Sequence, residues 1–410
     1  MTISARDKYI LRDTAAHQME LAYSPRNIAL EKLWLRHNAC LGERPTVCMD
    51  WRPFAGEIIT PLLRCEGEDA RSIEYALCMN FLEQELFNDD QVVPAYMPVH
   101  VDAWFAPFGV KPGEDSELYE IPKSQDIVKD LKRDFHLLHK TKFGVNMRVS
   151  QRRLEIYQSL LGDILPVRLT GGCLYALPTR CLAQVMSVDT ILTSMQQYPD
   201  LFHTMMDGLT EDYIRYFHFC EARGLILPTT RVESVCRGTF AFTNELPGPD
   251  VSARRPLTTH DVWGFLGTLE LGKIAPELYK EFLYPYFKRI AEMYGMLSYG
   301  FFEPVDAIWD GYLSDMPNLR KVCISSDCNE ELMGERLRHT NIVFHRKTSP
   351  AILGVEGELD ENAVRAGVKR TMAAARGCEV EFSQRGARTV HGDVARVRRY
   401  VELVREYSAD

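Results

Sequence analysis

From about residue 46 to its end, the chain alternates between short apolar runs and longer amphipathic segments. Short apolar runs predict strands, whereas apolar residues spaced three or four positions apart among charged ones predict helices. Sooner or later, each predicted strand is followed by a segment of the helical type. The eight runs lie near residues 46–51, 92–98, 164–170, 224–229, 296–302, 321–326, 341–346 and 378–383.

Strands that alternate with helices predict parallel pairing through crossover connections, and eight of them suit a closed (β/α)8 TIM barrel of the α/β class. An open doubly wound sheet is the alternative. Before the first strand, Ser24 followed by Pro25 is typical of a helix start, and Ile28, Leu30 and Leu33 continue the helical pattern. We therefore expect an N-terminal helical extension over residues 1–45 and a barrel domain over residues 46–410.

Composition and charge exclude some classes of function. The formal net charge of −9 argues against a nucleic-acid-binding surface, which would need clustered Lys and Arg. The first residues lack the apolar core of a secretory signal, and no apolar run reaches the roughly 18 residues of a membrane span. The 11 cysteines have no repeating spacing. Free thiols in a cytoplasmic protein are the expected state.

In a barrel, catalytic residues lie at the C-terminal ends of the strands. Glu303 follows the apolar run YGFF and precedes Pro304, so its carboxylate should be held at the barrel mouth for metal binding or acid–base chemistry. A salt bridge to Arg346 or Lys347 is the alternative. Cys328 is placed to bind a metal, and a place in the cap of the following helix is the alternative.

Cations at the strand ends favour an anionic substrate. His345, Arg346 and Lys347 end the seventh predicted strand, and such a group suits a carboxylate or phosphate. The alternative is a solvated strand end paired with neighbouring acids. Arg168 interrupts the apolar run ILPVRLTGG, and a buried arginine there would need a fixed carboxylate or a substrate anion.

Several common motifs are absent from the sequence. No GxGxxG or GxxxxGK[ST] follows a predicted strand, and neither HExxH nor GxSxG occurs. Nucleotide-binding loops, zinc proteases of the HExxH type and serine hydrolases therefore lose support.

The order of several segments resembles the uroporphyrinogen decarboxylase-like superfamily, and more narrowly a branch of it that is frequent in anaerobes. The resemblance spans about residues 25 to 405 and implies a (β/α)8 barrel. The segments that carry it are ILPVRLTGGCLYALPT, TEDYIRYFHFCEARG, FTNELPGPD, VWG, YGFFEPVDAIWD, PNLRKVCISSDCNEELMGERL and FHRKTSP.

The resemblance implies one of two chemistries. Uroporphyrinogen decarboxylases hold a tetrapyrrole with an arginine-rich MRQAGR-like segment and an aspartate, without a cofactor. Here the first strand reads VCMDWRPFAGE, which keeps Asp50 and Arg52 but lacks that signature. Methylcobalamin:coenzyme M methyltransferases instead bind zinc through a His-x-Cys pair after strand five and a later cysteine.

The zinc pattern is altered in this sequence. Relatives of the branch read like YGCCEPLH after strand five, whereas this chain reads YGFFEPVD. Phe301 and Phe302 replace the cysteines, and Asp306 stands at the histidine position. A metal, if zinc or another ion binds, must use a different set of ligands. The candidate metal ligands are Glu303, Asp306, Cys328 and His345.

The first hypothesis is a methyltransferase that moves a methyl group from a small methylated substrate to a corrinoid carried by a partner protein, with metal or acid assistance. The second is a cofactor-free decarboxylase (a lyase) acting on an anionic substrate such as a tetrapyrrole. The third is a non-catalytic binder of a corrinoid or tetrapyrrole. Glu303 and His345 are the catalytic candidates, and a homodimer stays open. The substrate-binding candidates are Asp50, Trp51, Tyr96, Arg168, Tyr175, Arg346 and Lys347.

Overall fold

The computed structural model describes residues 3–110, 127–172, 174–228, 234–235, 238–247 and 255–408. Its helices are α1 (Ala5–Ala22), α2 (Pro25–Asn38), α3 (Ala55–Ile59), α4 (Glu68–Cys78), α5 (Leu82–Phe87), α6 (Leu131–Asp134), α7 (Met147–Leu161), α8 (Pro178–Val185), α9 (Val188–Gln197), α10 (Pro199–Ala222), α12 (Pro276–Phe282), α13 (Tyr284–Ala291), α14 (Glu330–Leu337), α15 (Ala351–Gly354), α16 (Glu361–Ala374) and α17 (Val394–Ser408). Its strands are β1 (Thr46–Met49), β2 (Met97–His100), β3 (Ala103–Ala106), β4 (Lys142–Val145), β5 (Val167–Thr170), β6 (Leu174–Ala176), β7 (Trp263–Leu266), β8 (Met296–Tyr299), β9 (Leu319–Ile324), β10 (Val343–Thr348) and β11 (Val380–Gln384).

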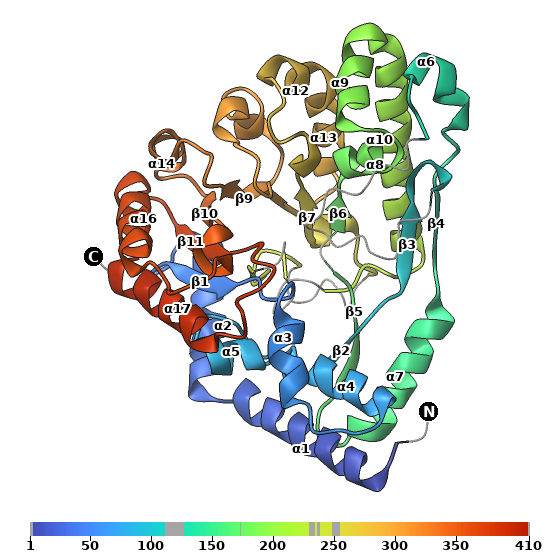
Figure 1. Ribbon diagram of the computed structural model, residues 1–410. Coiled ribbons are helices and arrows are strands. Elements are labelled where there is room, and N and C mark those ends of the chain that lie inside the picture. The colour runs from blue at the N-terminus through green and yellow to red at the C-terminus, as the bar shows by residue number, and fades with distance from the viewer. Residues whose placement is uncertain are drawn as a thin grey trace.

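The main sheet has seven parallel strands in the order β1-β11-β10-β9-β8-β7-β6. A separate parallel pair joins β2 to β5, and β3 pairs with β4 in the antiparallel sense. The strands of the main sheet curve around a common centre, with β2 and β5 on the remaining side and helices outside (Figure 1). The α/β architecture predicted from the sequence is thus confirmed.

The closed barrel predicted from the sequence is not confirmed. Among the described residues, no ladder joins β2 to β1 or β5 to β6, so strand pairing leaves the ring open on both sides of the β2–β5 pair. Proline explains the first break, because Pro94 and Pro98 remove two backbone donors from the predicted strand at 92–98 and only its last residues pair.

The strand predicted at 224–229 is also missing from the structure. Residues 225–228, which include Pro228, have no strand pairing, and residue 229 lies outside the described part of the chain. The strand that joins β8 on this side is instead β7, whose residues Trp263–Leu266 were not predicted as a strand. Its four buried residues resemble any short core segment, so the pattern alone did not distinguish them.

Two glycines divide one predicted strand between two sheets. The run ILPVRLTGG was expected to form a single strand, but β5 ends at Thr170 and β6 begins at Leu174. Gly171 and Gly172 lie between them, where the chain leaves the β2–β5 pair and joins the main sheet beside β7. Glycine suits such a bend because it carries no Cβ.

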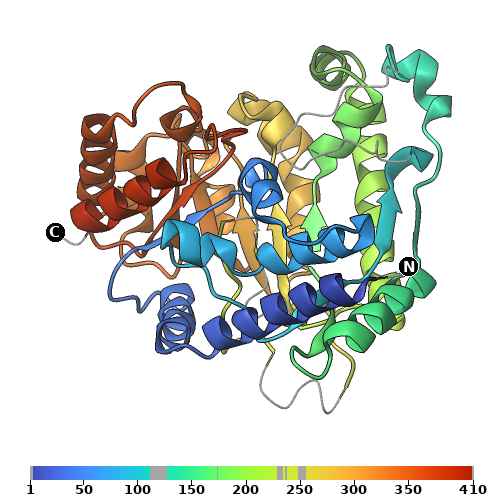
Figure 2. The same cartoon turned by 60° about the horizontal axis from the view of Figure 1, so that its bottom comes forward.

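The N-terminal helices form as expected. Ser24 caps α2 by accepting a hydrogen bond from the backbone N–H of Asn27, with Pro25 in the first turn. Helix α1 packs against α4 and α7 through a cluster of apolar side chains that includes Leu11, Leu77 and Leu161 (Figure 2). The boundary at residue 45 between an extension and a barrel domain remains a prediction.

Polar side chains of α1 and α2 bind the backbone that precedes β2. The amide of Gln18 donates to the carbonyl oxygens of Pro94 and Tyr96 at 2.8 and 3.1 Å. Asn27 donates to the carbonyl of Val93 at 3.0 Å and accepts from its N–H at 2.8 Å. These buried bonds replace the ladder that the proline-bearing segment does not make, since buried backbone groups must find partners.

A buried cluster of charged groups anchors α2 to the start of β11. His37 bonds Glu379 through Nδ1 at 2.8 Å and Glu381 through Nε2 at 3.2 Å, and Lys321 Nζ lies 2.8 Å from Glu381. Burial alone would lower the pKa of His37, but the hydrogen bonds to both carboxylates outweigh it and raise that pKa above its ordinary value. The imidazolium therefore offsets one of the two carboxylates.

A central segment, residues 238–242, runs through the middle of the ring of strands (Figure 1). Lys321 of β9 donates to Thr239 Oγ1 at 2.6 Å, and Trp263 of β7 donates to the carbonyl of Ala241 at 3.0 Å. Gly238 has φ +79°, and a Cβ there would lie 3.3 Å from Ser383 Cβ. Glycine is required at this close, left-handed position, and the interior of the ring is partly filled by backbone.

No helix in the described ranges is long and apolar enough to cross a membrane. The nine cysteines for which the structure gives a state are all free thiols, and seven of these are buried.

The His37 cluster predicts a dependence of stability on pH. A raised pKa in the folded state stabilises the protein fully below the unfolded pKa of about 6.5, and this contribution is lost as the pH rises through the folded pKa. The midpoint of thermal unfolding should therefore fall as the pH is raised above 6.5, beyond the change seen in a His37→Gln variant. His260→Gln, at an exposed position, is the control. Equal slopes for the His37→Gln variant and the parent protein would contradict the prediction.

Candidate functional site

A cavity of about 360 Å³ lies between β1, the β2–β5 pair and the central segment. We call it the inner cavity. It opens at the C-terminal ends of β1, β2 and β5, where active sites lie in α/β folds. The residues that line it are Cys48, Met49, Asp50, Trp51, Arg52, Met79, Asn80, Glu83, Gln91, Val92, Pro94, Tyr96, Pro98, His100, Thr170, Gly171, Gly172, Tyr175, Ser234, Gly238, Thr239 and Phe240.

Four of the seven predicted substrate-binding residues line the inner cavity. Asp50 and Trp51 follow β1, Tyr96 precedes β2, and Tyr175 lies on β6. β6 was not predicted as a separate strand, but the structure brings its Tyr175 to the same cavity as the end of β1. Their role in binding a substrate remains a prediction.

Glu83 of α5 supplies a carboxyl group to this cavity, and the sequence analysis did not single it out. Its side chain is buried, and desolvation together with the charges of Asp89 and Asp50 and a hydrogen bond to Asp89 raises its pKa well above the ordinary value. The equilibrium of the Glu83 carboxyl group is therefore shifted toward the protonated form, which can donate a proton into the cavity.

Asp89 is held in place by the backbone around it. Its carboxylate accepts from the N–H of Met49 at 3.0 Å and from the N–H of Gln91 at 3.0 Å. Because these bonds favour the charged form, the shared proton of the pair resides on Glu83. The sequence signal for this site was the pair of acids in NDDQ, directly before an apolar run. Two adjacent carboxylates at the start of a buried segment need partners inside the protein.

The inner cavity is also lined by a basic side chain, that of His100. His100 ends β2, retains accessible surface toward the cavity, and pairs through Nδ1 with Thr170 Oγ1 at 3.1 Å. Burial by the surrounding protein, followed by the charges of Arg52 and Arg153, lowers its pKa below the ordinary value. The imidazole is therefore neutral at pH 7 and can donate or accept one hydrogen bond.

Glu303 lies outside the inner cavity, in a second cavity of about 510 Å³ that Thr268, Lys273 and Asp327 also line. Its carboxylate accepts hydrogen bonds from three backbone N–H groups, those of Thr268 at 2.7 Å, Phe301 at 2.8 Å and Phe302 at 3.0 Å. Neither Arg346 nor Lys347 forms the salt bridge with Glu303 that was the alternative expectation. Glu303 fixes the turn after β8.

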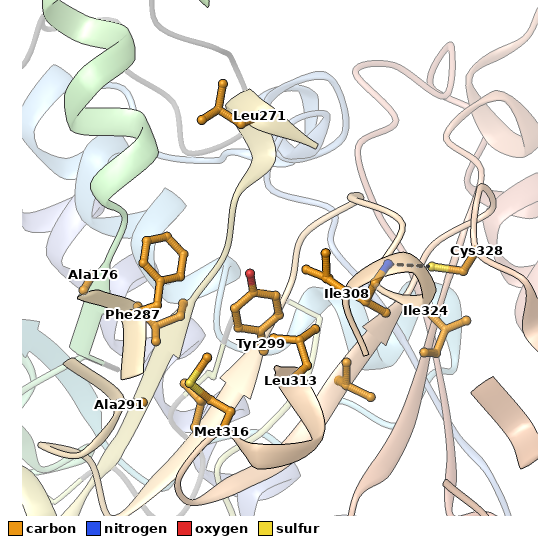
Figure 3. Close-up of a cluster of buried hydrophobic side chains, with 14 of the residues drawn as sticks. Ala176, Leu271, Phe287, Ala291, Tyr299, Ile308, Leu313, Met316, Ile324 and Cys328 are labelled. Atoms are coloured by element: carbon orange, nitrogen blue, oxygen red, sulfur yellow. Dashed lines mark hydrogen bonds between the residues drawn. The ribbon is translucent and has the colours of Figure 1, made fainter. Parts of the chain in front are cut away.

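Cys328 belongs to the apolar core beneath that turn. Figure 3 shows it beside Ile308 and Ile324, with its sulfur accepting a hydrogen bond from a backbone nitrogen, that of Val305 at 3.4 Å. Burial raises the pKa of the thiol above its ordinary value, so the thiolate needed for metal binding is disfavoured.

The side chain of His345 is also engaged by other residues of the protein. It is fully buried inside the ring, where Nε2 lies 2.6 Å from Ser383 Oγ and 3.7 Å from Glu381. Burial lowers its pKa well below the ordinary value, so the ring is neutral. Among the described residues, no three His, Cys, Asp or Glu side chains form a group that could hold a metal ion. The predicted set of Glu303, Asp306, Cys328 and His345 is not assembled.

Arg346 and Lys347 do not line either cavity. Side chains alternate along β10, so Arg346 points to the opposite face from its two neighbours. It pairs with Glu330 of α14 at 2.8 Å and donates to the carbonyl of Ile324 at 3.1 Å. Lys347 is buried and donates to the carbonyl of Gly300 at 3.1 Å. Both cations bind groups of the protein itself, whereas a substrate carboxylate had been expected as their partner.

The expectation of a buried Arg168 was wrong. Its side chain is exposed and lies over the ring of Tyr96, with Cζ 5.0 Å from the ring centre. The apolar run predicted a buried strand, but Val167 and Leu169 on either side of Arg168 are themselves only partly buried. Arg168 shares a face of β5 with Thr170 and so faces the side on which the inner cavity lies.

Comparisons with known proteins give little further guidance. No family model matches the chain, and no curated protein matches it. Among solved structures, the chain is similar to a methyltransferase from Methanosarcina mazei at 14% identity and a TM-score of 0.44, over 92% of this chain and 98% of that chain. A likeness at this level assigns neither a family nor an activity.

The bonds of Glu303 predict that its loss destabilises the fold. Glu303→Ala removes the acceptor of three buried N–H groups, and we expect it to lower the free energy of unfolding by about 1–3 kcal/mol. Glu303→Gln keeps one side-chain oxygen as an acceptor and should lose less. Denaturant unfolding of the three proteins is the measurement. An alanine variant as stable as the parent protein would contradict the assignment of Glu303 to the turn.

Proposed function

We propose that the inner cavity is the active site of a methyltransferase that uses acid assistance. The observation that supports this most is the protonated Glu83, which lines the cavity beside the anchored carboxylate of Asp89. A methyl group on oxygen or nitrogen is a poor electrophile, because the atom that must leave would carry away a negative charge or a strongly basic electron pair. Protonation of that atom removes the obstacle.

In the proposed step, the bond between the methyl carbon and the oxygen or nitrogen breaks. Its electron pair stays on the heteroatom, and the proton of Glu83 passes to that atom. The methyl group goes to a nucleophilic acceptor. Glu83 is left as a carboxylate in a buried position beside Asp89, where burial and like charge favour the recovery of a proton from water.

The acceptor in this proposal is a reduced corrinoid carried by a partner protein, and it is a substrate of the reaction. This part rests on the resemblance of the sequence to the uroporphyrinogen decarboxylase-like superfamily. No step runs through zinc, since the predicted ligands are engaged elsewhere: Glu303 with three backbone amides, Cys328 with the N–H of Val305, and His345 with Ser383.

A decarboxylase is the second candidate, and Arg52 at the inner cavity favours it. In that reaction the bond to a substrate carboxylate breaks, carbon dioxide leaves, and the proton of Glu83 goes to the carbon that keeps the electron pair. An acid–base pair in a largely uncharged cavity suits a small substrate with one anionic group better than a tetrapyrrole with many carboxylates.

The test is a Glu83→Gln variant assayed with free cobalamin reduced to the Co(I) state and a panel of aryl methyl ethers and methylamines. The parent protein should methylate the cobalamin, and the variant should do so about 10²–10⁴-fold more slowly, because it lacks the proton. Activity of the parent should fall as the pH rises through the raised pKa of Glu83. Absorbance of the cobalamin follows the reaction.

Glu85→Gln is the matched control, since Glu85 lies two positions along α5 and bonds His17 outside the cavity. It should keep the parent rate. Asp89→Asn should move the alkaline limb of the pH profile to lower pH, because the charge that raises the pKa of Glu83 is gone. Release of carbon dioxide without methylation would favour the lyase, and a fully active Glu83→Gln variant would exclude both roles of this acid.

A further inference from the structure

The mouth of the inner cavity carries an arginine without a carboxylate partner. Arg52 follows β1, lines the cavity and is exposed. Its guanidinium forms no ion pair with any acid in the described ranges of the chain, in contrast to Arg44, which binds Asp90 at 2.8 Å by two hydrogen bonds. An unpaired guanidinium at a cavity mouth is available to an anion from solution.

A second arginine approaches the same place from another element. Arg153 lies on α7, which packs against β2, and it also has no carboxylate partner within the described residues. The charges of both Arg52 and Arg153 act on His100. Three elements therefore contribute to this region: Arg52 after β1 and His100 at the end of β2 both line the inner cavity, and Arg153 lies on α7, which packs against β2.

The inner cavity therefore holds an acid as well as hydrogen-bond donors that suit an anion. Glu83, with Asp89 beside it, supplies a proton, and Arg52 and His100 supply donors. The walls also include the rings of Tyr96, Tyr175 and Phe240. Flat aromatic walls favour a flat ligand, since rings stack or meet edge to face.

We propose that Arg52, Arg153 and His100 form a carboxylate-binding subsite, and that the substrate of the inner cavity is a small aromatic carboxylate. The bidentate fork of a guanidinium fits the two oxygens of a carboxylate, and the neutral imidazole supplies a further N–H. The orientation of the substrate toward Glu83 rests on the proposed function, whereas the recognition of the carboxylate does not depend on which reaction follows.

The cations of this subsite differ from those that the sequence predicted for substrate binding. Arg346 and Lys347 were expected to bind a substrate carboxylate, but they bind Glu330 and the carbonyl of Gly300. In this proposal Arg52 binds the substrate carboxylate, because it lies in the turn after β1, where the cavity opens. Its neighbour Trp51 is buried against Phe87 and holds the turn.

The experiment compares benzoate with benzamide, which has the same shape and no charge. Isothermal titration at pH 7 should show that the parent protein binds benzoate more tightly than benzamide. In Arg52→Gln and in Arg153→Gln, the affinity for benzoate should fall about three- to tenfold, the range of one partly exposed charged contact. The affinity for benzamide should stay as it is, and added salt should weaken benzoate binding in the parent protein.

Arg152→Gln is the matched control, because Arg152 is an exposed arginine one position away on α7. It should bind benzoate like the parent protein. Equal affinity of the parent for benzoate and benzamide, or unchanged benzoate binding in both arginine variants, would overturn the proposal. Glu83→Gln should still bind benzoate, so a failure of the acid catalyst and a failure of the subsite give different results.

Discussion

The structure depends on how the backbone before β2 finds its hydrogen bonds. This segment runs beside β1 but carries Pro94 within it, and it does not extend the sheet. Gln18 and Asn27 supply the missing donors and acceptors, and Trp34 donates to the carbonyl of Asp90 at 2.8 Å. The ring of strands stays open there, and the opening is the inner cavity. The N-terminal helices thus hold in place the segment whose residues Pro94 and Tyr96 line the candidate site.

Two buried groups of acids show how surroundings decide protonation. Burial would raise the pKa of Glu381, but Lys321 and the hydrogen bond from His37 lower it well below the ordinary value, so Glu381 is charged. At Glu83, burial and Asp89 raise the pKa instead. The first group holds elements together, and the second holds a proton at a surface that a ligand can reach. Residue type alone does not separate them.

The parts of the fold that follow from local pattern were predictable. The runs that become β1, β8, β9, β10 and β11 are free of proline and each contains apolar residues, and Ser24 with Pro25 marks the start of α2. The failures share a physical cause, since they depend on neighbours far along the chain. Arg168 is exposed and lies over Tyr96, and Arg346 meets Glu330 because alternation turns it outward. Glu83 becomes a candidate only when Asp89 lies beside it.

The contact between His37 and Glu379 joins residues 342 positions apart. Helix α2 leaves the ribosome well before its partner does, because 342 positions separate the two residues. Until β11 is made, His37 lacks both carboxylates, and the helix that bonds the segment before β2 lacks its main anchor. Contacts of such long range slow folding, because the chain must close a large loop before the contact stabilises anything. The wall of the inner cavity before β2 is therefore secured only after β11 has been made, and until then Glu83 lacks the buried surroundings that raise its pKa.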